Sequence, residues 1–302
     1  MYHEHFGLRE APFTITPDTS FFFAHSSHQE ALNTLIVAVR SGEGFMKVVG
    51  EVGTGKTILC RKFLDALDRD QFISAYIPNP YVGPNTLLLA VADELGIEFP
   101  ERVTQHQLLK LLTKFLLESY AQQKRVVLCL DEAQAMPVET LEALRLLTNL
   151  ETERRKLLQV VLFGQPEIDT KLNNRAIRQL KQRITFSCRL RPLDLADVDF
   201  YIAHRLTIAG YRGARLFAED AVKRLFRASR GVPRLINVLS HKALMAAFGE
   251  GERRVSERHV RVAIADTESV QRGAWRRSRL LRYLGLAASV ALFCVGAIVW
   301  AM

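Results

Sequence analysis

The stretch GEVGTGKT, residues 50–57, decides the fold of this 302-residue chain. It matches the pattern G-x-x-x-x-G-K-[ST], in which glycines let backbone N–H groups curl around phosphates at the start of a helix. The apolar run FMKVV (45–49) before it predicts a buried strand, and TILCRKFLDAL (57–67) after it has apolar residues at helical spacing. A strand, a glycine-rich loop and a helix in this order favour a phosphate-binding loop over a coincidental glycine turn.

In that interpretation the loop binds ATP together with Mg2+. The Lys56 ammonium would reach the β- and γ-phosphates, and the Thr57 hydroxyl would ligate the magnesium ion. The residues expected to contact the nucleotide are Gly50, Glu51, Val52, Gly53, Thr54, Gly55, Lys56, Thr57 and Ile58.

A second motif, VVLCLDEAQ, places two acids at the end of an apolar strand. Open α/β sheets bind their ligands at the carboxyl ends of strands, where Asp131 and Glu132 would lie. We expect Asp131 to hold the magnesium ion through water and Glu132 to orient and polarise the attacking water. The alternative, a pair of solvated acids, is less favoured because a phosphate-binding loop precedes them.

Further polar residues are candidates for catalysis. Gln165 follows the apolar run LLQVVLFG, where its amide could bridge the water and the γ-phosphate. Arg178 and Arg183 precede the last apolar run, and an arginine from a neighbouring subunit can stabilise charge in phosphoryl transfer. We favour Arg183 for that role, whereas Arg234, next to a helix-starting Pro233, could point across a domain cleft. A loop glutamine without a role and a solvated helix face remain the alternatives.

Five apolar runs separated by helical segments predict an α/β fold with a doubly wound, five-stranded, mostly parallel sheet covered by helices. The runs are FMKVV, FISAYI, KRVVLCLDE, LLQVVLFG and ITFSCRL. After Pro192 the pattern changes to four consecutive helices, beginning with DVDFYIAHRL. We therefore expect an α/β core at 1–191 that includes the N-terminal segment, a helical lid domain at 192–267, a basic juxtamembrane linker at 268–283 and a transmembrane helix at 284–302.

Charge and cysteine content fit a cytoplasmic domain beside a membrane. The net charge is +9, but five arginines crowd the acid-free segment QRGAWRRSRLLR, so much of the excess suits anionic lipid headgroups rather than DNA. The four cysteines stand far apart in apolar runs, which indicates reduced, buried thiols.

The last residues of the sequence predict a membrane anchor. No charge occurs from Leu284 to Met302, close to the ~20 residues that a spanning helix needs. The preceding arginines would keep their flank inside the cell, and the N-terminus MYHEHFGLREAPF has no cleaved signal pattern. A buried apolar helix or one lying flat on the bilayer is the alternative.

Taken together, the motifs resemble those of an AAA+ ATPase. GEVGTGKT looks like its Walker A motif, LCLDE its Walker B, FGQPE a sensor-1 region, LKQRI an arginine-finger region and GVPRLIN a sensor 2. Within that superfamily the chain is similar to the ExeA/GspA group of bacterial secretion ATPases, through FGLREAPFTITPD, AYIPNPY, DEAQAMPVETLEALRLLTNLET and SRGVPRLINVLSHKALMAA. The likeness covers residues 1–267.

The resemblance implies an ATPase at the bacterial inner membrane, anchored by a single pass, with its ATPase domain in the cytoplasm. It implies partners among the assembly proteins of an MSHA-type type IV pilus or a related type II secretion machine, and a homo-oligomer in which an arginine finger acts across subunits. It also implies that residues 6–13 contribute to an adenine pocket. ExeA-type proteins continue into a periplasmic, peptidoglycan-binding region, which we do not carry over to a sequence that stops at Met302.

Two other functions are weighed against this one. A DNA-handling ATPase of the transposition-regulator type shares the core, but a membrane anchor and the lack of a basic stripe within residues 1–250 disfavour it, so nucleic acid is not an expected partner. A nucleotide-dependent scaffold that binds ATP but hydrolyses it poorly is disfavoured because both Asp131 and Glu132 are present.

Overall fold

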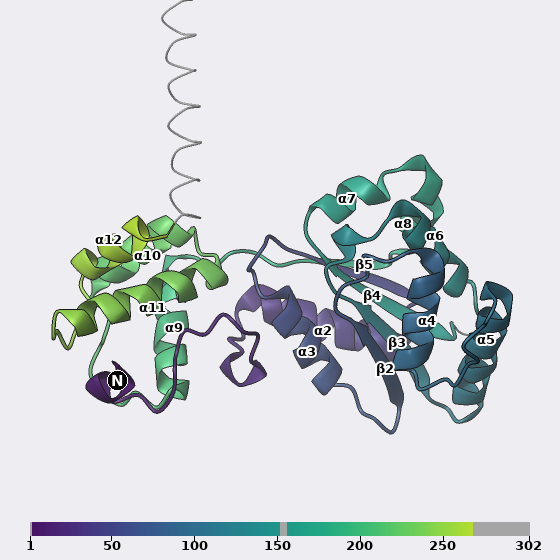
Figure 1. Ribbon diagram of the computed structural model, residues 1–302, viewed down its shortest axis with the longest axis horizontal. Coiled ribbons are helices and arrows are strands. Elements are labelled where there is room, and N and C mark those ends of the chain that lie inside the picture. Colours follow the sequence, from purple (N-terminus) through teal and green to yellow (C-terminus); the bar gives the residue numbers. More distant parts are fainter. Residues whose placement is uncertain (1, 152–155, 268–302) are drawn as a thin grey trace, which may run out of the picture. The chain divides into compact units, whose positions relative to one another are not determined.

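The computed structural model describes residues 2–151 and 156–267, which divide into two compact units (Figure 1). One unit comprises residues 16–193 and contains the sheet. The other comprises residues 1–15 together with the chain from Asp194 onward and is helical where it is described.

The sheet of the first unit has five parallel strands in the order β2-β3-β4-β1-β5. The strands are β1 (Phe45–Val49), β2 (Phe72–Ile77), β3 (Arg125–Leu130), β4 (Leu158–Gly164) and β5 (Phe186–Arg189). The predicted five-stranded α/β fold is therefore confirmed, and every strand pair within the described residues is parallel.

Helices cover both faces of this sheet, which explains why its strands are continuous apolar runs (Figure 1). Val126, Leu128 and Leu130 of β3 pack with α4 to α6, whereas Val127 and Cys129 face the opposite way, toward α2 and α3. Cys129 and Cys60 are buried as predicted, whereas Cys188 is only half-buried, which corrects the prediction for that thiol; Cys294 lies outside the described residues. The helices of this unit are α2 (Ser26–Ser41), α3 (Lys56–Asp65), α4 (Pro84–Glu94), α5 (Gln105–Ala121), α6 (Val138–Leu147), α7 (Glu167–Leu172) and α8 (Arg178–Arg183), with 3-10 turns η1 (Thr19–Phe21), η2 (Ala133–Ala135) and η3 (Arg175–Ile177).

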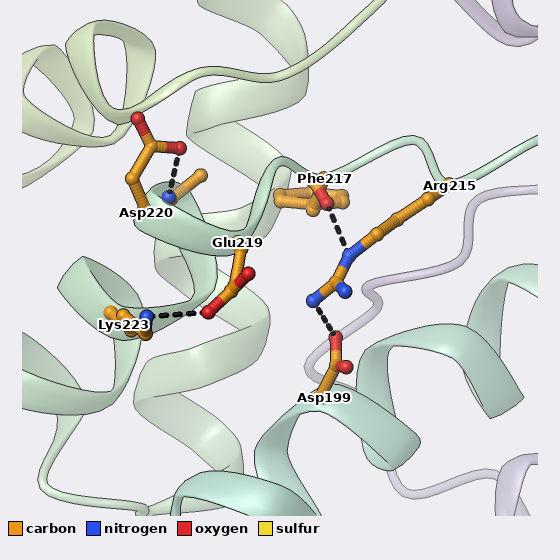
Figure 2. A network of polar contacts seen from close by, with 7 residues as sticks. Asp199, Arg215, Phe217, Glu219, Asp220 and Lys223 are labelled. Carbon is orange, nitrogen blue, oxygen red and sulfur yellow. Dashed lines mark hydrogen bonds and ion pairs between the residues drawn. The ribbon is translucent and has the colours of Figure 1, made fainter.

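The second unit contains the four helices that the sequence predicts after Pro192. They are α9 (Leu195–Ile208), α10 (Glu219–Ser229), α11 (Pro233–Gly249) and α12 (Glu257–Ala265). Arg215 fixes the segment before α10, because its guanidinium donates to the Phe217 carbonyl at 3.0 Å and pairs with Asp199 of α9 at 2.7 Å (Figure 2). Lys223 pairs with Glu219 one turn away on α10 in the same view.

Residues 1–15 belong to the helical unit, which corrects the prediction that the N-terminal segment is part of the α/β core. A short helix, α1 (Tyr2–Phe6), contacts α11, and the side chains of Phe6, Leu8 and Phe13 are buried. The Phe13 and Phe217 rings pack edge to face, with 5.8 Å between their centroids. These apolar side chains need a partner surface, and the helical unit provides it.

No helix among the described residues is long and apolar enough to cross a membrane. The predicted basic linker, 268–283, and the predicted transmembrane segment, 284–302, lie outside the described residues.

Candidate functional site

The phosphate-binding loop connects β1 to α3 as predicted. Gly53 and Gly55 adopt φ values of 80° and 97°, in the left-handed region that favours glycine, and Gly55 is the N-cap of α3. A Cβ added at Gly50 would lie 2.6 Å from the Thr54 hydroxyl oxygen, so only glycine fits there. Glycine thus occupies the positions at which the backbone of the loop turns tightly. The N-terminus of α3 points into that loop.

The Lys56 ammonium lies over the loop. Its Nζ donates to the carbonyls of Gly50 at 2.9 Å and Glu51 at 3.0 Å, and the residue is 5% exposed. Burial lowers the pKa of Lys56, and the charges of Glu132 and Asp131 oppose that shift. Because the acids oppose the effect of burial, the lysine and the two acids belong to one electrostatic cluster.

Thr57 and Asp131 bring the two motifs into direct contact. The Thr57 hydroxyl donates to Asp131 Oδ2 at 2.6 Å, and Asp131 Oδ1 accepts from the Glu132 backbone N–H at 2.9 Å. Burial raises the pKa of Asp131, while its hydrogen bonds and Lys56 oppose that shift. The Tyr76 hydroxyl lies 3.5 Å from the same Oδ2. A hydroxyl and a buried carboxylate side by side are a donor set that fits Mg2+, which prefers oxygen ligands.

Glu132 sits at a strained position with its carboxylate held by two amides. Its φ is 51°, one of three positive values among the described non-glycine residues. The Glu132 Oε2 accepts from the Gln165 side-chain amide at 3.2 Å and, through a short hydrogen bond, from the Gln134 amide. Gln134 Oε1 in turn accepts from the Gln165 backbone N–H at 2.9 Å.

The strand order explains this convergence. β4 lies between β1 and β3, so the residue that follows β4, Gln165, ends between the phosphate-binding loop and Glu132. We predicted Gln165 to bridge the water and the γ-phosphate; in the structure its amide contacts Glu132.

The loop is also supported from α2 by a histidine that the sequence analysis did not single out. His28 is 4% exposed, and its Nε2 lies 2.8 Å from the Thr54 carbonyl oxygen. Because a carbonyl only accepts, Nε2 carries the proton in this contact. Burial lowers the pKa of His28, with the bond to Thr54 opposing the shift.

The predicted arginines lie outside this cluster. Arg183, half-buried at the end of α8, donates to the Thr148 hydroxyl at 3.2 Å, whereas Arg178 is exposed. Arg234 is an exposed residue in the first turn of α11, in the helical unit. Their catalytic roles stay predictions, as does the contribution of residues 6–13 to an adenine pocket.

Tyr76, Gln134 and His28 are the contributors that sequence reasoning missed. Two of them had a signal: Tyr76 is the penultimate residue of the predicted strand FISAYI, and Gln134 ends the quoted motif VVLCLDEAQ. His28 had none, because nothing near it in the sequence indicates contact with residue 54.

Comparison with known proteins identifies the core. Residues 39–172 match a family model described as an AAA domain. General secretion pathway protein A of Aeromonas hydrophila is 40% identical over 286 residues, which is 94% of this chain and 52% of that protein. The chain therefore spans about half the length of this curated relative.

Solved structures share the fold. The ORC2 protein of Aeropyrum pernix, in its ADPNP–ADP complexes, superposes with a TM-score of 0.60 at 18% identity and covers 83% of this chain and 72% of its own. Cdc6p of Pyrobaculum aerophilum gives a TM-score of 0.63 at 20% identity, covering 82% and 70%. At such identities the likeness concerns the fold alone. The family model and the similarity to the secretion protein therefore support one conclusion: the chain contains an AAA domain and is similar along most of its length to general secretion pathway protein A.

Proposed function

We propose that this protein uses ATP hydrolysis at the carboxyl edge of its sheet to support assembly of a secretion machine, or of an MSHA-type type IV pilus, at the bacterial inner membrane. The observation that carries the chemistry is the hydrogen bond between Thr57 and Asp131, because it joins the phosphate-binding loop to the acidic strand end. The cellular role is supported by the 40% identity to general secretion pathway protein A.

Nucleotide binding would use the loop and the start of α3. Backbone N–H groups of residues 50–58 would face the phosphates, and Lys56 would exchange the carbonyls of Gly50 and Glu51 for phosphate oxygens. Thr57 and Asp131 would hold a magnesium ion, which when bound neutralises phosphate charge.

Hydrolysis would depend on Glu132. Its carboxylate, placed just beyond β3, would orient the attacking water and take its proton, and Gln165 would help to fix its position. An arginine from a neighbouring subunit, Arg183 before Arg178, would stabilise charge in the transition state, and Arg234 would report on the nucleotide from the helical unit. This arrangement requires a homo-oligomer.

Membrane attachment would come from residues 284–302, with the arginines before them on the cytoplasmic side. The likeness to origin-recognition proteins concerns the fold alone. No specific observation therefore favours the DNA-handling alternative.

The test is a capture experiment with the Glu132→Gln protein, which we expect to bind ATP and release it slowly because hydrolysis is blocked. It is purified gently from native membranes with ATP, and co-purifying proteins are identified by mass spectrometry. The Lys56→Ala protein, which should not load ATP, is the matched control. Enrichment of inner-membrane secretion or pilus components on the Glu132→Gln bait supports the proposal, whereas recovery of DNA with a recombinase would replace it.

A further inference from the structure

Gln134 is the residue through which the ends of β3 and β4 are connected at the acidic cluster. It follows Glu132 by two residues, lies in η2 and is half-buried. Its side chain contacts Glu132 on one side and the backbone of Gln165 on the other.

The orientation of its amide follows from its partners. A backbone N–H can only donate, so the Gln134 atom 2.9 Å from the Gln165 nitrogen must be the carbonyl oxygen. The NH2 group is thereby turned toward Glu132, where it donates to Oε2. The contact with Gln165 thus determines that the amide nitrogen of Gln134, and not its oxygen, faces Glu132.

The amide of Gln134 lies against the end of β4. A Cβ added at Gly164, the last residue of that strand, would lie 3.4 Å from Gln134 Oε1 and 3.3 Å from Ile168 Cγ2. The amide is therefore packed within about van der Waals distance of the strand end. The residue it holds, Glu132, has a backbone φ of 51° and therefore depends on its surroundings to keep this conformation.

We infer that Gln134 is a positioning residue for hydrolysis. Its amide donates to Oε2 of Glu132 and accepts from the Gln165 backbone N–H, and in this way it sets the orientation of the Glu132 carboxylate. The inference rests on the proposed function, in that Glu132 is the group that orients the attacking water. With Oε2 held by amides, the other carboxylate oxygen is presented to the water. A displacement of about 1 Å in such a group can lower a rate about 10^2-fold.

The chain offers a nearly isosteric test. Gln134→Glu keeps an oxygen that can accept from the Gln165 N–H and removes the donation to Glu132. Gln134→Met removes both contacts without adding a charge. Gln122→Glu is the matched control, because it adds the same charge at an exposed position before the start of β3, at the opposite edge of the sheet.

The full-length proteins are assayed for steady-state ATP hydrolysis and for binding of a fluorescent ATP analogue. We expect both Gln134 variants to lose about 10- to 100-fold in kcat while the affinity for the analogue stays within about twofold, and Gln122→Glu to match the parent. The same Gln134 substitutions are then made in the Glu132→Gln background. A residue that acts through Glu132 has no further effect there, whereas a merely structural residue would lower the rate again.

The outcomes separate the inference from the proposed function. A kcat that is unchanged or raised in both Gln134 variants, with Glu132→Gln still impaired, overturns the role of Gln134 alone. Equal losses in the parent and Glu132→Gln backgrounds, or loss of analogue binding, also overturn it. An unimpaired Glu132→Gln protein would instead overturn the site assignment on which the inference rests.

Discussion

The N-terminal segment is held to the helical unit by a buried polar network, and Asn237→Leu should release it. Asn237, in the motif GVPRLIN, is 6% exposed. Its Nδ2 donates to the Thr14 carbonyl at 3.1 Å and its Oδ1 accepts from the Tyr201 hydroxyl at 2.9 Å. Arg205 completes the network by donating to the Pro12 carbonyl at 2.5 Å.

The size of the effect follows from these contacts. Leucine has a similar shape but makes neither hydrogen bond. Only the bond to Thr14 holds the segment, because Tyr201 and Asn237 both lie on helices of the unit; its loss costs ~1 kcal/mol net, with a further cost because the half-buried Thr14 carbonyl loses its donor. The free energy of local opening of residues 8–15 should therefore fall by ~1–2 kcal/mol. Since ~1.4 kcal/mol is a factor of ten, the equilibrium constant for opening rises ~5- to 30-fold.

Amide hydrogen exchange read by mass spectrometry measures this opening directly. The Arg9 N–H, which donates to the Ala209 carbonyl at 2.8 Å, lies within the reporting peptide. Thr207→Ala is the control, since the Thr207 hydroxyl bonds to the Ala203 carbonyl of its own helix at 2.9 Å. Unchanged protection of residues 8–15 in Asn237→Leu would refute the reasoning.

Three further predictions concern the nucleotide unit and the membrane. Lys56→Ala should abolish ATP binding, and undiminished affinity in calorimetry would contradict the assignment. His28→Phe should weaken ATP binding about tenfold, because the Thr54 carbonyl loses its donor, while exposed His106→Phe should not. Because the pKa of His28 is lowered in the folded protein, the unfolded chain binds a proton at this histidine at a higher pH than the folded chain does, and the parent loses folding stability as the pH falls below ~6.5. The thermal midpoint of His28→Phe should therefore fall less between pH 7.5 and 5.5 than that of the parent. Deleting residues 276–302 should release the protein from membranes, and continued sedimentation with them would indicate another attachment.

The parts of the fold that the sequence predicts are those encoded locally. β3 and β4 are buried on both faces, so each is a continuous apolar run, and the run is visible without knowing its neighbours. Lys56 and Thr57 lie in one contiguous motif whose geometry is set by its own glycines. For that reason the residues of the phosphate-binding loop could be predicted without knowledge of the rest of the fold.

The parts that were missed depend on contacts between distant segments. The order β2-β3-β4-β1-β5 places Gln165 beside Glu132, and chain order does not reveal it. Helix α2 was not predicted although Ala31, Leu35 and Ala38 recur at helical spacing and are buried. The N-terminal segment was assigned to the wrong unit. The apolar residues of its FGL and PF stretches indicate that the segment is buried, but they do not indicate which unit it packs against.

The chain segments that connect the two units are hydrogen-bonded, within the first unit, to β1 and α3, the elements on either side of the phosphate-binding loop. The chain crosses between the units twice, at residues 15–16 and 193–194. Before the second crossing, the Leu190 N–H donates to the Val49 carbonyl at 2.8 Å, at the base of the phosphate-binding loop. After the first, the Pro17 carbonyl accepts from Arg61 of α3 at 2.8 Å. Within the first unit, both connecting segments are therefore bound to elements that flank the phosphate-binding loop, one to β1 and the other to α3.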